Sequence, residues 1–405
     1  MRIIERKTYL ETLIRNRDRQ IIKVISGVRR CGKSTLLESF MEYLLNAGVS
    51  KAQVVYINFE DIEFEDIRDY RKLYDYVTER LSLTQMNYVF LDEIQHVEGF
   101  MKAIDSLYIK KNVDLYITGS NAQLLSGEFA TLMTGRFIEV KMLPLSFAEY
   151  CEAKGVSTGF SSALLQELYR TYLENSSFPY TLQIDEVKKD VLEYLRALYN
   201  SILLKDIIFR KRINDALMLE SVARFLFNNV GKTLSSTKIA HTMTSFGRKI
   251  DQRTVEKYLE ALRESQLFYE ARRYNVKGKQ ELATLEKYYA VDIGLRFMLL
   301  GGQNLDVGHI LENVVYLELL RRDYEVFVGQ VDRTEIDFMA TRDGITLYIQ
   351  IAASIRDEDT LARELRPLRA IGDNHPKLIL TLDDDPDGNH EGIVTKNALR
   401  WLLDC

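Results

Sequence analysis

The chain has 405 residues, which is enough for about two or three domains with buried cores and excludes a single small module. Apolar residues make up 46% and charged residues 28%, a balance that excludes a mainly disordered or fibrous chain. With 54 basic and 59 acidic side chains the net charge is −5, which excludes a strongly basic DNA-coating protein and limits any nucleic-acid contact to a local patch.

The cysteines and the lack of long apolar runs indicate the compartment. Cys31, Cys151 and Cys405 are widely spaced, and they form no pair typical of a zinc site or a disulfide framework. The N-terminal stretch is charged and amphipathic, and the sequence contains no run of about 18 apolar residues. We therefore expect a cytoplasmic protein in a reducing compartment, without a membrane partner.

Short β-branched or aromatic runs alternate with helical stretches between Gln20 and Lys141. The strand-like runs lie at 21–26, 53–59, 87–92, 114–120 and 136–142. Such alternation is typical of a largely parallel sheet covered by helices, because parallel strands need crossover connections. The sequence therefore predicts an α/β domain over residues 1–143.

A phosphate-binding motif follows the first of these runs. Residues 27–34, GVRRCGKS, satisfy G-x-x-x-x-G-K-[ST] directly after an apolar strand and directly before a helical stretch. Glycines let the backbone wrap a phosphate chain, Lys33 reaches the terminal phosphates, and Ser34 ligates Mg²⁺. The motif predicts a P-loop NTPase sheet that binds ATP and Mg²⁺; a coincidental glycine loop is the alternative. The predicted nucleotide-binding residues are Gly27, Val28, Arg29, Arg30, Cys31, Gly32, Lys33, Ser34 and Thr35.

A second signal is an apolar run that ends in two acids. Residues 88–93, YVFLDE, place Asp92 and Glu93 at the expected carboxyl end of a strand, the sheet edge where open α/β folds bind ligands. Asp92 is predicted to hold Mg²⁺, and Glu93 to polarise the water that attacks the terminal phosphate. Helix capping after a core strand is the alternative for these acids.

Two further polar positions follow the next strand. Ser120 and Asn121 lie at its expected tip, where a polar side chain senses the γ-phosphate, although Gly-Ser-Asn is also an ordinary turn that caps a helix. Arg136 stands at a helix-to-strand corner and is a candidate arginine finger for its own or a neighbouring subunit. A surface arginine paired with a carboxylate is the alternative for Arg136.

Beyond Pro144 the strand signals give way to helical periodicity, which predicts a helical lid or connector over residues 144–215. Residues 216–300 contain three helix candidates, the second after a Ser cap and the third after an Asp cap, and two short strands around a Lys277–Gly278 turn. Three helices and a hairpin predict a winged-helix domain. Residues 301–405 combine two helices with four strands, which predicts a smaller α/β domain.

The winged-helix segment leaves the partner open. Its third helix carries four acidic and three basic residues, which is unfavourable for contact with DNA. The predicted wing is basic, because Arg272, Arg273, Lys277 and Lys279 outnumber Glu270. Double-stranded DNA at the wing and an unidentified protein are therefore the two partners that the sequence predicts.

Several segments resemble a known family. GVRRCGKST, FLDEIQHV, ITGSNAQLLSGEF and TGRFIEVKMLPLSFAEY are similar to the motifs of prokaryotic AAA+-type P-loop ATPases that carry a C-terminal domain of unknown function. Later segments, among them NVVYLELLRRDYEVFVG and GIVTKNALRWLL, extend the resemblance over nearly the whole chain. The resemblance implies an ATPase core of the additional-strand class, with Asp92 as the metal acid, Glu93 as the catalytic acid and Asn121 as the sensor. Arg136 matches the family's Gly-Arg position.

The last segment resembles the restriction-endonuclease-like fold, in which a helical Glu, a strand Asp and a Glu-x-Lys on the next strand bind Mg²⁺ and activate water. Glu312 and Asp337 match the first two positions, but Gln350 and Ala352 stand where the Glu and the Lys belong. Losing a metal ligand and the charged catalytic group should abolish phosphodiester hydrolysis. We expect a nuclease-like scaffold without nuclease activity; Glu335 as a substitute ligand is the alternative.

Together these signals predict an enzyme, an AAA+-type ATPase that hydrolyses ATP and whose nucleotide state changes how its C-terminal domains engage DNA or a protein partner. A slow nucleotide-gated regulatory protein without motor activity is the alternative function. An ATP-dependent nuclease that uses Glu312 and Asp337 is the third. The sequence also leaves a homo-oligomer open, because one chain shows no subunit interface.

Overall fold

The computed structural model describes residues 4–119, 133–156, 161–184, 187–302 and 306–404. The chain folds into two compact units, Met1–Pro144 and Leu145–Cys405.

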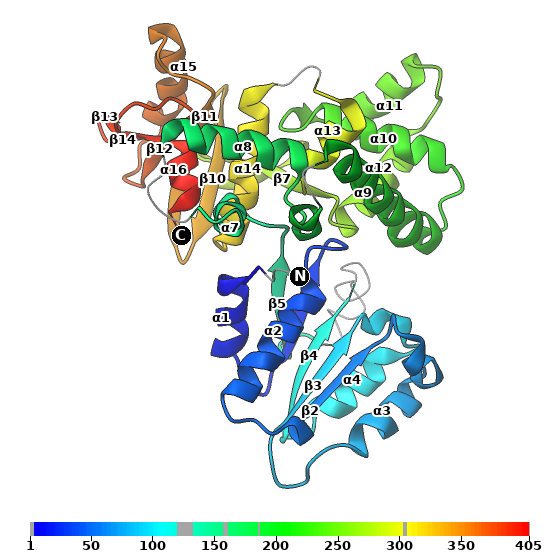
Figure 1. The fold of residues 1–405 in the computed structure, drawn as a ribbon. Helices are drawn as coiled ribbons and strands as arrows, with labels where there is room; N and C mark the ends of the chain where they lie inside the picture. The colour runs from blue at the N-terminus through cyan, green and yellow to red at the C-terminus, as the bar shows by residue number, and fades with distance from the viewer. Residues whose placement is uncertain (1–3, 120–132, 157–160, 185–186, 303–305, 405) are drawn as a thin grey trace. The chain divides into compact units, whose positions relative to one another are not determined.

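The first unit is built on a sheet of five parallel strands (Figure 1). Their spatial order is β2-β3-β4-β1-β5, so the first strand lies between the fourth and fifth. The strands are β1 (Ile22–Gly27), β2 (Val54–Asn58), β3 (Asn87–Asp92), β4 (Val113–Thr118) and β5 (Phe137–Met142). The predicted α/β fold with a parallel P-loop-type sheet is confirmed.

Helices cover both faces of this sheet. Those of the first unit are α1 (Lys7–Arg15), α2 (Lys33–Asn46), α3 (Tyr70–Thr78) and α4 (Phe100–Tyr108), with short 3-10 turns at Lys51–Gln53, Ile62–Ile67 and Ile94–His96. Side chains of α3 and α4 join the strands in one apolar cluster, while Phe40 of α2 packs on Phe90 and Tyr116 of the opposite face. The central strands β1, β3 and β4 are buried along their whole length, which explains their continuous apolar sequences.

The second unit begins with helices. They are α7 (Phe147–Ala153), α8 (Ser162–Asn175), α9 (Lys188–Ser201) with a π-helical continuation at Ile202–Phe209, α10 (Ala216–Asn228), α11 (Ser236–Ser245) and α12 (Gln252–Glu264), and a short 3-10 turn lies at Pro179–Gln183. The Ser235 and Asp251 side chains accept hydrogen bonds from the backbone N–H groups of Lys238 and Thr254, so both predicted caps begin their helices.

A nine-stranded sheet and four further helices form the rest of the described second unit (Figure 1). Its strands are β6 (Thr233–Leu234), β7 (Phe268–Asn275), β8 (Gln280–Ala290), β9 (Glu325–Val331), β10 (Thr334–Arg342), β11 (Ile345–Ala352), β12 (Lys377–Thr381), β13 (Gly388–His390) and β14 (Ile393–Asn397). The remaining helices are α13 (Ile293–Leu300), α14 (Val307–Arg321), α15 (Glu358–Arg369) and α16 (Ala398–Leu403). The spatial order is β13-β14-β12-β11-β10-β9-β7-β8-β6.

The hairpin β7–β8 belongs to the same sheet as the C-terminal strands. Arg273–Asn275 of β7 pair in parallel with Val328–Gln330 of β9. The sheet therefore runs without a break across residue 300, where the sequence pattern placed a domain boundary.

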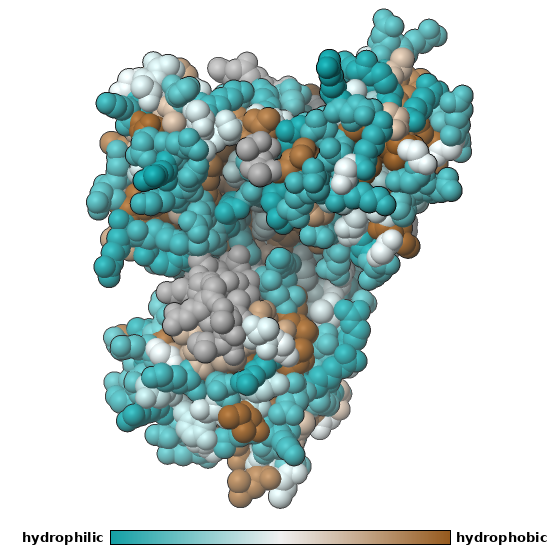
Figure 2. All heavy atoms as spheres, turned by 180° about the vertical axis from the view of Figure 1, so that it is seen from behind, coloured by the Kyte–Doolittle hydropathy of each residue, from teal (hydrophilic) through white to brown (hydrophobic). Residues whose placement is uncertain are grey.

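The molecular face drawn in Figure 2 is mostly polar. On the face drawn in Figure 2, hydrophilic residues cover most of the area and hydrophobic ones form small, separate patches. Among the described residues, no helix combines the length and the apolar composition needed to cross a bilayer.

Candidate functional site

The phosphate loop connects the end of β1 to the start of α2. Arg30 and Gly32 have positive φ angles of 66° and 108°, so the backbone turns through left-handed conformations before the helix begins at Lys33. A Cβ atom on Gly27 would lie 2.5 Å from the Met142 carbonyl oxygen and 2.6 Å from the Cys31 sulfur. Glycine is therefore required at position 27, because the loop packs directly against the end of β5.

Lys33 lies at the centre of the loop. Its side chain is only 6% exposed, and the ammonium donates a hydrogen bond of 3.1 Å to the Gly27 carbonyl. Its Nζ atom also lies 3.8 Å from Oε1 of Glu93. A phosphate that entered the loop would meet this ammonium together with the first N–H groups of α2.

Asp92 is fully buried at the end of β3. It accepts hydrogen bonds from the Tyr56 hydroxyl at 3.3 Å and from Thr118, and it is hydrogen-bonded to Ser34. Burial raises the pKa of the Asp92 carboxyl above its usual value, and the hydrogen bonds from Ser34 and Thr118 oppose that rise. The carboxylate and the Ser34 hydroxyl thus face each other, as two ligands of one cation do.

Glu93 follows in a left-handed conformation, with φ of 54° and ψ of 46°. Its backbone N–H donates to the Thr118 hydroxyl at 3.0 Å, and its carboxylate accepts a hydrogen bond from Gln95. The backbone turn after β3 brings the Glu93 carboxylate near Lys33, and the Glu93 side chain keeps 15% of its surface exposed. It is therefore open to water beside the loop.

These residues fit ATP and Mg²⁺. The loop leaves no room for a side chain at Gly27, and its N–H groups and Lys33 supply positive charge for phosphates. Ser34 and Asp92 supply the oxygen ligands that Mg²⁺ prefers.

The other predicted nucleotide-binding residues differ in their burial and contacts. Val28 and Cys31 are buried, and burial raises the pKa of the Cys31 thiol. Arg29 donates to Glu60 at 2.7 Å, while Arg30 is exposed. Thr35 is the third residue of α2 and is partly buried. Ser120 and Asn121 lie outside the described residues.

Arg136 is not brought to the phosphate loop. It precedes Phe137, which pairs with Ile22, the first residue of β1. The phosphate loop starts at Gly27, the last residue of β1. These ends lie about 17 Å apart along the strand, because each strand residue advances roughly 3.3 Å. The Arg136 guanidinium pairs with Asp105 of α4. A role toward a neighbouring subunit stays a prediction.

Two residues of the site were not predicted from the sequence. Thr118, the last residue of β4, contacts both Asp92 and Glu93, and Tyr56 of β2 contacts Asp92. A signal for Thr118 existed, because it ends the strand that pairs with β3, two residues before the polar Ser120. Tyr56 carried no signal, since an aromatic in a strand is ordinary.

A buried charge cluster lies in the second unit. The Lys287 side chain of β8, 4% exposed, places its ammonium 2.8 Å from Glu312 of α14, 2.7 Å from Glu335 and 3.8 Å from Asp337 of β10. Tyr289 also donates to Glu312 at 2.6 Å. Burial lowers the pKa of Lys287, but the carboxylates outweigh it and hold that pKa above its usual value. The carboxylates singled out in the sequence thus surround a lysine of the hairpin.

Gln350, which stands at the predicted third nuclease position, makes two hydrogen bonds. Gln350 accepts a hydrogen bond from the Asp337 backbone and donates to Glu364, each bond close to a normal length at 2.8 and 2.7 Å. Within the parts of the chain that the structure describes, no three His, Cys, Asp or Glu side chains are placed to hold a metal ion together.

The charge cluster predicts a pH-dependent stability. Burial, with repulsion from Glu312, raises the pKa of Asp337 to about 8, although Lys287 opposes the rise. The folded state therefore binds this proton more tightly than the unfolded state, and the resulting stability is lost as the pH rises through about 8. Between about pH 6.5 and about pH 9, we expect the second unit to lose roughly 1 to 2 kcal/mol.

Urea unfolding followed by the fluorescence of the single tryptophan, Trp401, measures this loss, because Trp401 lies in α16 of the second unit. Asp337→Asn is the control, since it removes the titrating carboxyl. An equal pH dependence in the variant and the wild type would contradict the assignment to Asp337.

The basic side chains of the β7–β8 hairpin, the predicted wing, are less free for DNA than their charge implies. Arg272 pairs with Glu281 at 2.5 Å, Arg273 bonds Gln330 at 2.5 Å and Lys277 pairs with Asp332 at 2.6 Å. A phosphate backbone at the wing would have to compete with these contacts.

Known protein families and solved structures are similar to the first unit in sequence and in fold. An AAA domain model matches residues 19–151, and a model described as a domain of unknown function (DUF8612) matches residues 166–306. The Walker-type ATPase PABY2304 of Pyrococcus abyssi has a similar fold, with a TM-score of 0.51 and 16% identity over 73% of this chain and 96% of that one.

Two relatives are similar over most of the sequence. An uncharacterized protein of Haemophilus influenzae is 40% identical over 402 residues, which is 99% of both chains. The uncharacterized protein MJ1544 of Methanocaldococcus jannaschii is 30% identical over 374 residues, covering 87% of this chain and 80% of that protein. The chain therefore belongs to the same family as these two proteins, and its first unit has the P-loop ATPase fold and matches an AAA domain model over residues 19–151.

Proposed function

We propose that the first unit binds Mg²⁺ and ATP and hydrolyses ATP to ADP and phosphate. The observation that carries this proposal is the meeting of Lys33, Asp92 and Glu93 at one edge of the sheet, with Ser34 bonded to Asp92. A phosphate loop alone would suit many nucleotide enzymes, but a partly exposed glutamate beside its lysine suits attack by water.

Each residue has a role in this proposal. Lys33 turns from Glu93 to the terminal phosphates, and Ser34 and Asp92 hold Mg²⁺, which neutralises phosphate charge when bound. Glu93 accepts the proton of the attacking water, and Thr118 fixes the orientation of both acids through its hydroxyl. Asn121 as the sensor of the terminal phosphate is part of the same proposal.

The second unit is the output in this proposal, and its engagement of double-stranded DNA or of a protein changes with the bound nucleotide. It acts as a nuclease-like scaffold without cleavage. Lys287 supports this view, because its ammonium occupies the centre of the carboxylates that would otherwise ligate a metal. Arg272 and Lys277 of the predicted wing are already paired with acidic side chains, and this favours a protein partner over DNA.

A second candidate is a nucleotide-gated regulator that hydrolyses ATP too slowly to power work. The position of Arg136 favours it, because this arginine pairs with Asp105 at the far edge of the sheet. Hydrolysis by P-loop proteins is slow when no arginine finger contacts the transferred phosphate.

Binding of Mg·ATP to the full chain, measured by calorimetry, tests the proposal. We expect Lys33→Ala to weaken binding by roughly 10- to 100-fold, the effect of removing a charged partner from the phosphates. Lys72→Ala, an exposed lysine of α3, is the matched control and should bind as the wild type does. Absence of binding by the wild type, or equal binding by both variants, would refute the phosphate site.

A further inference from the structure

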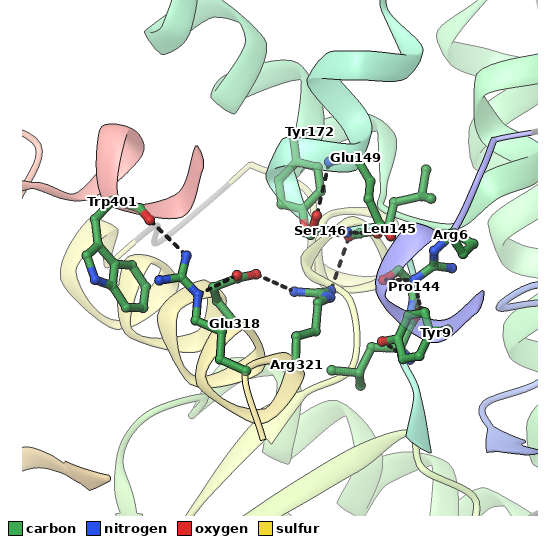
Figure 3. A network of polar contacts seen from close by, with 12 residues as sticks. Arg6, Tyr9, Pro144, Leu145, Ser146, Glu149, Tyr172, Glu318, Arg321 and Trp401 are labelled. Atoms are coloured by element: carbon green, nitrogen blue, oxygen red, sulfur yellow. Dashed lines mark hydrogen bonds and ion pairs between the residues drawn. The ribbon is translucent and has the colours of Figure 1, made fainter. Parts of the chain in front are cut away.

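Arg6 joins the phosphate loop to the end of the first unit. Its side chain is 6% exposed, and its guanidinium donates to the carbonyl of Cys31 at 3.1 Å, of Leu143 at 2.7 Å and of Pro144 at 3.3 Å (Figure 3). Cys31 lies inside the phosphate loop, whereas Leu143 and Pro144 are the last two residues of the unit. One fixed fork of donors therefore holds both segments.

Residues 142–144, the end of the first unit, also contact the phosphate loop and α1 directly. Met142 packs against Gly27, as the missing space for a Cβ atom shows. The backbone N–H of Leu143 donates to the Tyr9 hydroxyl at 3.2 Å, and the Arg6 guanidinium lies 4.9 Å from the centre of the Tyr9 ring. The last residues of the first unit are thus held against its phosphate loop.

The next residue is fixed in the second unit. Leu145 donates its N–H to Ser177 at 2.9 Å. Its carbonyl accepts from Tyr172 at 3.0 Å and from Arg321 at 3.2 Å (Figure 3). Arg321 also pairs with Glu318 at 3.2 Å.

Glu318 extends these contacts within the second unit. It pairs with Arg322 at 2.8 Å, and Arg322 donates to the Trp401 carbonyl at 2.9 Å. Residues 143 and 144 are therefore hydrogen-bonded within the first unit, and the next residue, 145, is hydrogen-bonded within the second.

We propose that Arg6 is the positioning residue through which the phosphate loop acts on the second unit. The proposal rests on the proposed function, because it needs nucleotide in the loop. A phosphate pulls on the loop N–H groups and reorients the Cys31 peptide, whose carbonyl bonds Arg6. Since the same guanidinium holds residues 143 and 144, the change reaches Leu145 through consecutive peptide bonds. Such coupling is reciprocal, so a ligand of the second unit also alters nucleotide affinity.

Amide hydrogen exchange of the full chain, with and without a nonhydrolysable Mg·ATP analogue, tests this. In the wild type we expect the analogue to change exchange at the loop, at residues 145–150 and at residues 316–322. In Arg6→Gln the loop response should persist and the response beyond residue 144 should be lost. Turnover should fall roughly tenfold, as for one charge-assisted hydrogen bond, while ATP affinity stays near that of the wild type.

Three further variants separate coupling from folding. Arg6→Lys keeps the charge but not the fork, and Tyr9→Phe removes only the hydroxyl that holds Leu143, so both should reduce the distant response while remaining folded. Arg15→Gln, an exposed arginine of α1, is the matched control and should respond as the wild type does.

The failures are distinguishable. If the wild type does not bind the analogue, the proposed function fails and this inference with it. If it binds but shows no change beyond residue 144, or if the Arg6 and Tyr9 variants keep the full distant response, the proposed function stands and the role of Arg6 is refuted.

Discussion

Glu93→Gln is expected to lower ATP turnover by roughly 100-fold or more while ATP still binds. The carboxylate is the only group in our assignment that takes the proton of the attacking water, and a positioned base contributes about 10²- to 10⁴-fold. Glutamine keeps the shape and the hydrogen bond with Gln95 but cannot accept the proton. Since Glu93 also lies 3.8 Å from Lys33, its neutralisation frees the lysine for phosphate.

Steady-state hydrolysis and calorimetric binding, each with and without double-stranded DNA, measure the two effects separately. Glu65→Gln, an exposed acid of the same unit, is the control and should hydrolyse ATP as the wild type does. Unchanged turnover in Glu93→Gln would show that another group acts as the base. Tight binding with negligible turnover in the wild type itself would favour the gated regulator.

Lys287→Met is expected to destabilise the second unit by about 3 to 5 kcal/mol. The methionine replaces the unbranched apolar part of the side chain but removes the ammonium that faces Glu312, Glu335 and Asp337. Breaking a buried ion pair from one side leaves an uncompensated charge, which costs more than the pair itself contributes. Glu312 bears most of this cost, because it is 5% exposed.

Urea unfolding followed by Trp401 fluorescence gives the free energy of unfolding of this unit. Lys257→Met, an exposed lysine of α12, is the control and should change stability by less than about 0.5 kcal/mol. The double variant Lys287→Met with Glu312→Gln should recover part of the loss, since one carboxylate no longer needs a partner. A stable single variant would mean that the carboxylates are protonated or hydrated without the lysine.

Local patterns were sufficient for the first unit. Each predicted strand is present, because runs such as NYVFLD and VDLYIT are apolar enough to be buried on both faces. The phosphate motif lies between β1 and α2 as predicted, and the acid pair follows β3. Sequence neighbours determine these features, so the sequence alone contains them.

Contacts between distant segments could not be read in the same way. Lys287 is an ordinary lysine in a strand until folding brings β8 beside α14 and β10, and no spacing relates it to Glu312 or Asp337. The parallel pairing of Arg273–Asn275 with β9 likewise depends on residues more than fifty positions away. For Arg136, the corner position was visible, but its pairing with Asp105 across the sheet edge was not.

The pairing of β7 with β9 limits how the chain can be divided. A cut near residue 300, or at the end of the matched segment 166–306, would separate the two strands and leave each with unsatisfied backbone groups along an open edge. Such edges bind other strands and promote aggregation. A fragment that ends there would carry the hairpin's Lys287 without Glu312 and Asp337. A portion transferred into another protein should therefore keep the hairpin and the C-terminal strands together, as the unit from Leu145 through α16 does, and recombination that respects the fold exchanges this unit as a whole.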